Sequence, residues 1–245
     1  MDKSAQMDAL SKTVARASDR RADLLLCPEL FMTGYYLKAE VNELAESIDG
    51  PFIRQACQLA LKHRIMMVFG YPEKAGSRIY NSAVVISSDG DVVANYRKLH
   101  LPGDFENSYF KPGNSYTTFN IKGIKTGILI CYDSEYPEAV RKLALEDTEL
   151  LLVPTALSSP YPIVATKVIP SRAFENGIYI AYADFCGEDN ELAYAGLSCI
   201  VDPNGNDLAR AGNKEEILYA QIDTDEIVKA RSALPYLQQR RPDLY

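Results

Sequence analysis

The feature that most constrains the fold of this chain is an internal repeat. The segment ADLLLCPELF (22–31) resembles TELLLVPTAL (148–157), because each has an acidic residue, three leucines, a small apolar residue and then a proline. A second similar pair lies further along each half, YNSAVVISSDGDVVANY (80–96) and YAGLSCIVDPNGNDLARA (194–211). Each member of that pair has two β-runs around an Asp/Asn/Gly turn. The repeat predicts two halves that fold alike.

Each half also contains an apolar strand that follows a helical stretch. Residues 65–73 follow the helical stretch 52–64, and residues 178–187 follow the stretch 171–177. Both halves therefore have the order helix, strand, helix, strand, hairpin. Continuous apolar strands need cover on both faces, which helices can provide on one face and a second sheet on the other. We predict an α/β fold of two similar halves, with sheet packed on sheet and helices outside.

The two halves differ in how they begin. The second half opens with the strand TGILICYD (126–133), whereas the first opens with a helix in which Met7, Leu10, Val14 and Ala17 share one face. No linker divides the chain. We therefore expect one domain over residues 1–245 whose first half lacks an opening strand, either through a truncated or misassigned start or as a natural feature.

Composition and charge restrict the class of protein. With 47% hydrophobic and 24% charged residues, and no window near eighteen consecutive apolar residues, the chain is typical of a soluble protein without a membrane partner. The N-terminus lacks the apolar core of a signal peptide, so a cytoplasmic location is expected. The net charge of −7 argues against a nucleic-acid partner. Five scattered cysteines fit no disulfide framework and no metal spacing, which predicts reduced thiols.

The motifs that are absent narrow the chemistry further. The chain has two histidines, His63 and His100, and it contains no HExxH, GxxxxGK[ST], GxGxxG or GxSxG. The motifs that most common metal, nucleotide-binding and serine-hydrolase sites require are therefore absent from the sequence. The sequence predicts a site without metal or cofactor, built from Cys, Glu, Asp and Lys.

Three predicted strands end in residues with reactive side chains. Glu29 follows LLLCP, Lys98 follows VVANYR, and Cys131 follows GILI. Ligands bind beyond the carboxyl ends of strands in α/β sheets, because the loops there diverge. A single buried cysteine is usually inert and a single loop carboxylate or lysine is usually solvated. Three such residues at strand ends nevertheless predict one shared site, and we assign structural roles to the remaining cysteines, which are Cys27, Cys57, Cys186 and Cys199.

Three segments resemble the signature segments of the carbon–nitrogen hydrolase (nitrilase) superfamily. They are CPELFMTGY (27–35), YRKLHLPGDFENSYFKPGN (96–114) and ILICYDSEYPE (128–138), and both their order and their spacing agree with that family. The resemblance covers nearly the whole chain, through SRAFENG (171–177) and GLSCIVDPNGN (196–206) to RRPDLY (240–245). It implies a four-layer αββα sandwich, and it implies that the missing opening strand is a departure from the family.

The resemblance also implies roles for four residues. Glu29 would be the general base, Lys98 the lysine that stabilises the oxyanion, and Cys131 the nucleophile. Many members carry a second glutamate eight residues after the lysine, where this chain has Glu106. A solvated loop acid is the alternative for Glu106. These groups suit amide hydrolysis, which needs a nucleophile, proton transfer and a place for negative charge on the carbonyl oxygen.

The segment after the nucleophile favours an amidase. True nitrilases typically follow the cysteine with tryptophan and glutamate, whereas Tyr132–Asp133 and Pro137–Glu138 resemble amidase-type members. We expect a small carboxamide to be hydrolysed to a carboxylic acid and ammonia through a cysteine thioester. Ser134–Glu135 offers no arginine for an acidic substrate, so a neutral or cationic amide is favoured, although Arg97 or Arg172 could supply positive charge from another loop.

Two further residues are candidates for substrate binding. The backbone N–H of Tyr132 is the second oxyanion donor that the family resemblance implies. Thr155 lies in the turn that, by the repeat, stands opposite Pro28–Glu29, although it could simply cap its strand. The tail SALPYLQQRRPDLY (232–245) has exposed-looking aromatics, and such tails cross onto a partner subunit in this family. A homodimer or a larger homo-oligomer is therefore expected.

Four alternatives stay open at the level of the sequence. The chain could act on nitriles, or it could pass the acyl group to an amine as an acyltransferase does. Cys131 could instead pair with His100 as in papain-like sites. The chain could also be a non-catalytic binding or assembly protein that has kept the sandwich.

Overall fold

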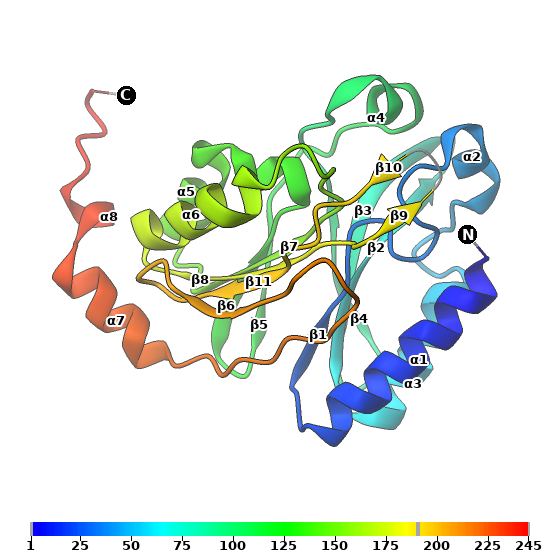
Figure 1. Ribbon diagram of the computed structural model, residues 1–245, viewed down its shortest axis with the longest axis horizontal. Coiled ribbons are helices and arrows are strands. Elements are labelled where there is room, and N and C mark those ends of the chain that lie inside the picture. Colours follow the sequence, from blue (N-terminus) through cyan, green and yellow to red (C-terminus); the bar gives the residue numbers. More distant parts are fainter. Residues whose placement is uncertain (1, 190–191, 245) are drawn as a thin grey trace.

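The computed structural model describes residues 2–189 and 192–244. Two β-sheets pack face to face, and helices cover their outer faces (Figure 1). Side chains of both sheets share one buried cluster, which includes Val68 and Val85 from one sheet and Leu150 and Leu152 from the other. The predicted α/β sandwich with four αββα layers is therefore confirmed.

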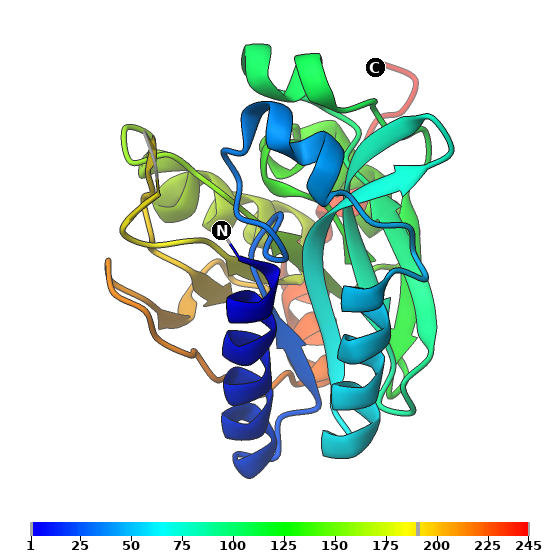
Figure 2. The same cartoon turned by 90° about the vertical axis from the view of Figure 1, so that its right-hand side faces the viewer.

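The first half forms a four-stranded sheet in the order β1-β2-β3-β4. Strands β1 and β2 are parallel, and the other neighbours are antiparallel. Helices α1 and α3 cover its outer face (Figure 2), where Leu10, Val14 and Phe52 pack against Met67 and Phe69. The elements are α1 (Lys3–Asp19), β1 (Leu24–Leu26), η1 (Lys38–Glu40), α2 (Val41–Leu44), α3 (Pro51–His63), β2 (Met66–Ala75), β3 (Arg78–Ile86), β4 (Val92–Arg97) and α4 (Gly103–Tyr109).

The second half forms a six-stranded sheet in the order β12-β11-β8-β7-β6-β5. Strands β6, β7 and β8 are parallel neighbours. Helices α5 and α6 cover its outer face, and a small β9–β10 hairpin projects beyond the sheet. The elements are β5 (Thr117–Ile121), β6 (Ile124–Ile128), η2 (Cys131–Glu135), α5 (Pro137–Leu145), β7 (Leu150–Pro154), η3 (Val164–Val168), α6 (Ile169–Asn176), β8 (Tyr179–Ala183), β9 (Glu188–Asp189), β10 (Leu192–Ala193), β11 (Cys199–Val201), β12 (Asp207–Arg210), α7 (Thr224–Ala233) and α8 (Tyr236–Gln239).

The internal repeat corresponds to equivalent elements. The paired leucine runs form β1 and β7, and the two predicted hairpins are β3–β4 and β11–β12, both antiparallel. Strand β7 lies between β6 and β8. Strand β1, in contrast, is at the edge of its sheet within the described residues 2–189 and 192–244. One domain over residues 1–245 stays a prediction.

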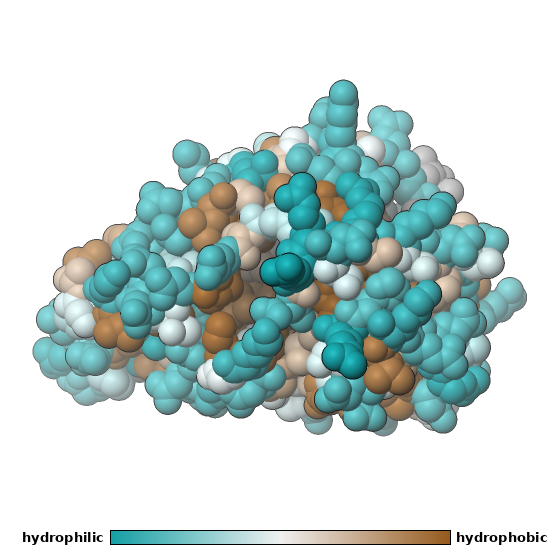
Figure 3. All heavy atoms as spheres, turned by 90° about the horizontal axis from the view of Figure 1, so that it is seen from below, coloured by the Kyte–Doolittle hydropathy of each residue, from teal (hydrophilic) through white to brown (hydrophobic). Residues whose placement is uncertain are grey.

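Apolar side chains are concentrated inside the sandwich. Strand β7 is buried along its whole length, and β2 and β3 are buried over most of theirs. The face shown in Figure 3 is mainly hydrophilic, with its hydrophobic residues in separate small groups. None of the described helices combines the length and the hydrophobicity of a membrane span.

Candidate active site

Glu29 lies in a tight turn just beyond β1 that is anchored to both sheets. The Gly70 N–H of β2 donates to the Pro28 carbonyl at 3.1 Å, and the Glu29 N–H donates to the Thr155 carbonyl beyond β7 at 3.3 Å. Leu30, the next residue, has a positive φ of 48°. The Glu29 side chain is fully buried. Strand pairing and this turn together fix the direction in which the carboxylate points.

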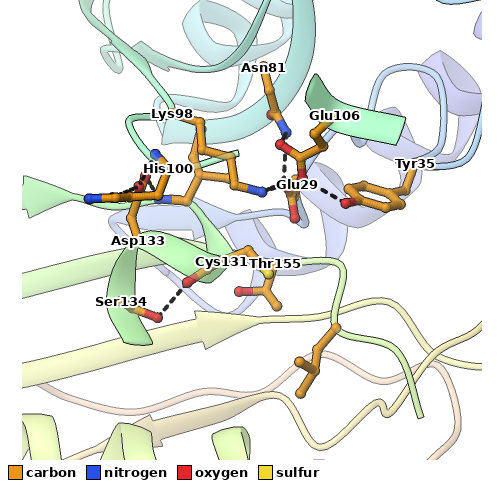
Figure 4. A network of polar contacts seen from close by, with 12 residues as sticks. Glu29, Tyr35, Asn81, Lys98, His100, Glu106, Cys131, Asp133, Ser134 and Thr155 are labelled. Carbon is orange, nitrogen blue, oxygen red and sulfur yellow. Dashed lines mark hydrogen bonds and ion pairs between the residues drawn. The ribbon is translucent and has the colours of Figure 1, made fainter. Parts of the chain in front are cut away.

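Lys98 follows β4 and is buried with its ammonium between two carboxylates (Figure 4). Its Nζ lies 2.6 Å from Glu29 Oε1 and 2.5 Å from Glu106 Oε1. The Lys98 N–H donates to the Asn81 carbonyl at 2.8 Å, so the backbone of β3 positions the lysine. The ammonium thus connects the end of β4, which carries Lys98, to the turn after β1, which carries Glu29, and to helix α4, which carries Glu106.

Glu106 is a buried residue of α4 rather than a solvated loop acid. Its Oε1 accepts a hydrogen bond from the Tyr35 hydroxyl at 2.6 Å. The Asn81 amide donates to Glu29 Oε1 at 2.7 Å and to Glu106 Oε2 at 3.4 Å. Tyr35 and Asn81 were missed by the sequence reasoning. Asn81 carried a usable signal, because a polar residue at the start of the continuous apolar run of β3 is unusual unless its side chain has partners.

Cys131 occupies a sharp turn after β6, which corrects one sequence expectation. The apolar run GILI predicted a strand up to the cysteine, but β6 ends at Ile128 and Cys131 begins η2. Cys131 has a positive φ of 45°, a strained conformation for a residue with a Cβ. The Ser134 hydroxyl stabilises the turn by donating to the Cys131 carbonyl at 2.7 Å. The turn places Cys131 beyond the end of β6, on the side where Glu29 and Lys98 lie (Figure 4).

Asp133 links the cysteine turn to the segment that carries Lys98. Its buried carboxylate accepts hydrogen bonds from the Tyr96 hydroxyl at 2.7 Å and from the His100 N–H at 2.8 Å. Lys98 lies between these two donors along the chain. His100 Nδ1 is also 2.7 Å from Asp133, and the ring stacks on Tyr136 at 4.0 Å between centroids. These contacts assign His100 to positioning rather than to a papain-like pair with Cys131.

Burial and charge set the protonation of the reactive groups. Burial raises the pKa of Glu29 to about 7; Lys98 opposes that rise and Glu106 adds to it. Burial alone would lower the pKa of Lys98, but the carboxylates of Glu106 and Glu29 outweigh it and raise that pKa, so the lysine stays charged. Burial raises the pKa of Cys131 well above its ordinary value, and the charge of Glu29 adds to the rise. The cysteine is therefore a neutral thiol at pH 7.

The remaining two candidates contribute differently. Thr155 is fully buried beside Cys131, but its hydroxyl donates to the Val153 carbonyl at 3.2 Å, and its backbone carbonyl binds Glu29. The N–H of the next residue, Ala156, faces the Cys131 sulfur and lowers its pKa slightly. The Tyr132 ring is partly exposed and packs edge-on against Tyr136 at 5.1 Å between centroids. Among the described residues, no group of three or more His, Cys, Asp or Glu could hold a metal ion.

Gly70 is required by the close approach of β2 to the Glu29 turn. A Cβ at this position would lie 2.1 Å from the Leu30 nitrogen and 2.7 Å from the Glu29 Cα. We expect Gly70→Ala to displace the Glu29 carboxylate, to lower kcat/KM by on the order of 100-fold, and to reduce the free energy of unfolding by about 1–3 kcal/mol. Steady-state kinetics and urea denaturation measure the two effects.

The matched control for that substitution is Gly212→Ala, because an added Cβ there meets no heavy atom within 4 Å. Its activity and stability should equal those of the unmodified protein. A fully active Gly70→Ala variant would show that the position of the Glu29 turn does not limit turnover.

The fold and the site define a class of protein: an αββα enzyme with a cysteine, a lysine and carboxylates at the ends of its strands. The carbon–nitrogen hydrolase family model matches residues 1–232. The chain belongs to the carbon–nitrogen hydrolase family, and it is accordingly a hydrolase that acts on carbon–nitrogen bonds.

Individual relatives agree with this assignment. The chain is 40% identical to a protein of Pseudomonas protegens named "Hydrolase in pqqF 5'region", over 100% of this chain and 86% of that protein. It is 35% identical to an (R)-stereoselective amidase of a Pseudomonas species, over 89% of this chain and 80% of that enzyme. Among solved structures, an amidase from Nesterenkonia sp. superposes with a TM-score of 0.90 at 32% identity, covering 100% of this chain and 90% of that one.

Structures of the amidase from Nesterenkonia sp. AN1 contain small amides or a group derived from one. A cysteine-to-alanine variant was solved in complex with butyramide. A glutamate-to-glutamine variant carries the acetamide moiety of fluoroacetamide, covalently added at the active-site cysteine.

Proposed function

We propose that this chain hydrolyses a small carboxamide to a carboxylic acid and ammonia through a thioester on Cys131. The observation that carries the proposal is the buried Glu29–Lys98 pair at 2.6 Å, which interacts electrostatically with the Cys131 thiol held on its strained turn. The amidase names of the (R)-stereoselective enzyme and of the Nesterenkonia structure support an amide substrate, whereas relatives at 34% and 36% identity are named nitrilases.

The first half-reaction forms the thioester. Because the thiol is neutral, its proton must leave as the sulfur attacks the carbonyl carbon, and Glu29 accepts that proton. The carbonyl oxygen becomes an oxyanion, which Lys98 and the Tyr132 N–H stabilise, each by on the order of 3 kcal/mol. When the carbon–nitrogen bond breaks, Glu29 returns the proton to nitrogen and ammonia departs. The acyl group then remains on the Cys131 sulfur.

The second half-reaction releases the acid. Glu29, again a carboxylate, takes a proton from water as the water oxygen attacks the thioester carbon. The carbon–sulfur bond breaks, and Glu29 gives the proton back to the sulfur. Glu106 shares the Lys98 ammonium with Glu29 and raises the pKa of Glu29, which keeps that residue suited to move a proton in both directions near neutral pH.

The first test is ammonia release by the protein and by Cys131→Ala. Acetamide, propionamide and butyramide are compared with acetonitrile, propionitrile and butyronitrile, and intact mass is used to look for a retained acyl group. We expect ammonia from the amides and none from Cys131→Ala, because the nucleophile is gone. Release from the nitriles alone would replace the amidase proposal with a nitrilase.

Cys57→Ala is the matched control, because Cys57 is a partly exposed thiol of α3 outside the site. It should release ammonia like the unmodified protein. Absence of both ammonia and acyl adduct with every compound would favour a non-catalytic protein. An adduct that is transferred to an added amine would indicate an acyltransferase.

The pKa of Glu29 predicts how activity depends on pH. A protonated Glu29 cannot accept the thiol proton, so kcat/KM should rise with pH through a midpoint near 7, where burial has placed that pKa. Glu29→Gln should lower kcat/KM by about 100- to 10,000-fold and abolish this rise.

Glu226→Gln is the control for Glu29→Gln, because it removes a partly exposed carboxylate on α7, paired with Lys229 outside the site, and should keep the wild-type profile. A Glu29→Gln variant that retains the rise near pH 7 would assign the titration to another group and remove Glu29 from the role of base.

We also propose that the chain forms at least a homodimer. Helices α7 and α8 extend along one side of the sandwich, and the chain end projects away from it (Figure 1). Exposed apolar side chains gather there, including Phe174, Val228, Leu234 and Tyr236. Sedimentation at micromolar concentration should give a mass of at least two chains, since burial of these groups favours association. A monomer would contradict the proposal.

The cytoplasmic location stays a prediction of the sequence.

A further inference from the structure

Asp184 lies at the same sheet edge as the reactive residues and has no role in the steps above. It directly follows β8, as Cys131 follows β6 and Thr155 follows β7. Because β6, β7 and β8 are parallel neighbours, their carboxyl ends meet at one edge. Asp184 is 8% exposed.

The turn after β7 brings Asp184 close to the nucleophile. The Ala156 N–H faces the Cys131 sulfur, and the next N–H, that of Leu157, donates to Asp184 Oδ1 at 2.8 Å. Consecutive Cα atoms are ~3.8 Å apart, so the two groups bound by this turn are near neighbours. The charges of Glu29 and Asp184 also act on each other, and Asp184 raises the pKa of the Cys131 thiol.

The second carboxylate oxygen of Asp184 is buried without a hydrogen-bond partner among the described residues. Oδ1 holds Leu157, and the Phe185 N–H also faces the carboxylate and lowers its pKa, but Oδ2 has no partner of hydrogen-bond geometry among the described residues. The Tyr194 hydroxyl is also buried; the Tyr35 N–H faces it and lowers its pKa, but no described residue forms a hydrogen bond of full geometry with it. Tyr194 forms an isolated antiparallel β-bridge with Ser158, the residue after Leu157. Burial raises the pKa of the Tyr194 hydroxyl, and the charges of Glu29 and Asp184 add to the rise.

Asp184 is a carboxyl group at this edge that no described cation offsets. The only ammonium described inside the site is that of Lys98, and it is occupied by Glu29 and Glu106. Asp184 forms no ion pair with any described residue, and burial raises its pKa well above the ordinary value. Burial raises the pKa of half-buried Glu135 at the end of the cysteine turn, and the positive charges of Lys98 and Arg172 oppose that rise, so Glu135 is not an unbalanced carboxylate. A buried carboxyl group without a cation takes up a proton instead, so an ionised Asp184 would need a positive partner, which none of the described residues provides.

We propose that Asp184, with Tyr194, binds a protonated amine on the acyl part of the substrate, so that the preferred substrates are short aliphatic amides bearing a primary ammonium. The inference rests on the proposed amidase function and specifies its substrate class. The ammonium supplies this positive partner and donates hydrogen bonds to Oδ2 and to the Tyr194 hydroxyl oxygen. An amide with a carboxylate in this place meets charge repulsion from Asp184 and is rejected.

The test uses amides that differ in one group. Glycinamide is compared with propionamide, and β-alaninamide with butyramide, since in each pair an ammonium replaces a methyl group. At pH 7 the amines are mostly protonated, because an α-amino group has a pKa of about 7.7–8.0. We expect at least one ammonium amide to exceed its partner in kcat/KM by about 10-fold or more, the effect of one charged hydrogen bond.

Asp184→Asn separates specificity from a merely structural role, because the asparagine carbonyl can still accept from the Leu157 N–H. The ratio of the two kcat/KM values in the favoured pair should fall by about 10- to 100-fold. Tyr194→Phe should lower the ratio by a smaller factor. Asp225→Asn removes an exposed carboxylate on α7 and should leave the ratio unchanged. An equal loss for both members of the pair, or a wild-type ratio near one, would overturn the inference.

Binding to Cys131→Ala keeps the inference distinct from the proposed function. If no amide is hydrolysed, the amidase proposal fails, and calorimetry with the same four compounds then decides about Asp184. Tighter binding of an ammonium amide, lost in Cys131→Ala/Asp184→Asn, would support the amine site. Equal binding within each pair, or no binding, would refute it.

Discussion

The buried Lys98 ammonium between two carboxylates is the interaction on which the rest of the site depends. A buried ammonium without partners would be too costly to keep charged, and two buried carboxylates 2.6 and 2.5 Å from one point would repel each other without it. The three groups come from separate elements, namely the turn after β1, the end of β4 and helix α4. The ion pairs are therefore satisfied only when the first half is fully folded, so assembly of the catalytic groups and folding are the same event.

The packing of the two sheets adds Cys131, the proposed nucleophile, to this cluster. Asp133 fixes the cysteine turn to Tyr96 and His100 on either side of Lys98, while the Thr155 carbonyl holds Glu29 from beyond β7. Each half thus positions a residue of the other. The strain at Cys131, with its φ of 45°, is sustained by these bonds, because the surrounding structure determines the turn more strongly than the local sequence does.

Much of this arrangement could be predicted from the sequence, for physical reasons. The repeat predicted the sandwich because equal patterns of apolar strands and turns bury the same surfaces. Reactive residues after predicted strands identified Glu29, Lys98 and Cys131, since parallel strands end at one edge. The sequence reasoning missed Asn81, Tyr35 and Asp184, whose partners lie 25 to 71 residues away, beyond the range of any local pattern. It also extended β6 to the cysteine, because the apolar residues at 128–130 directly before Cys131 give no sign of a positive φ.

The protonation states explain why burial serves catalysis here rather than only stability. Burial makes the thiol a weak acid, which by itself would slow attack, but the same burial raises the pKa of Glu29 to about 7 and makes it a stronger base. In the proposed mechanism the proton therefore passes between groups whose proton affinities have been raised together, and no free thiolate has to form. The fixed charge of Lys98 keeps the pKa of Glu29 from rising so far that Glu29 would always be protonated at neutral pH. An ammonium bound at Asp184 would act in the same way as the Lys98 charge, because it would offset the negative charge that opposes an oxyanion beside Cys131.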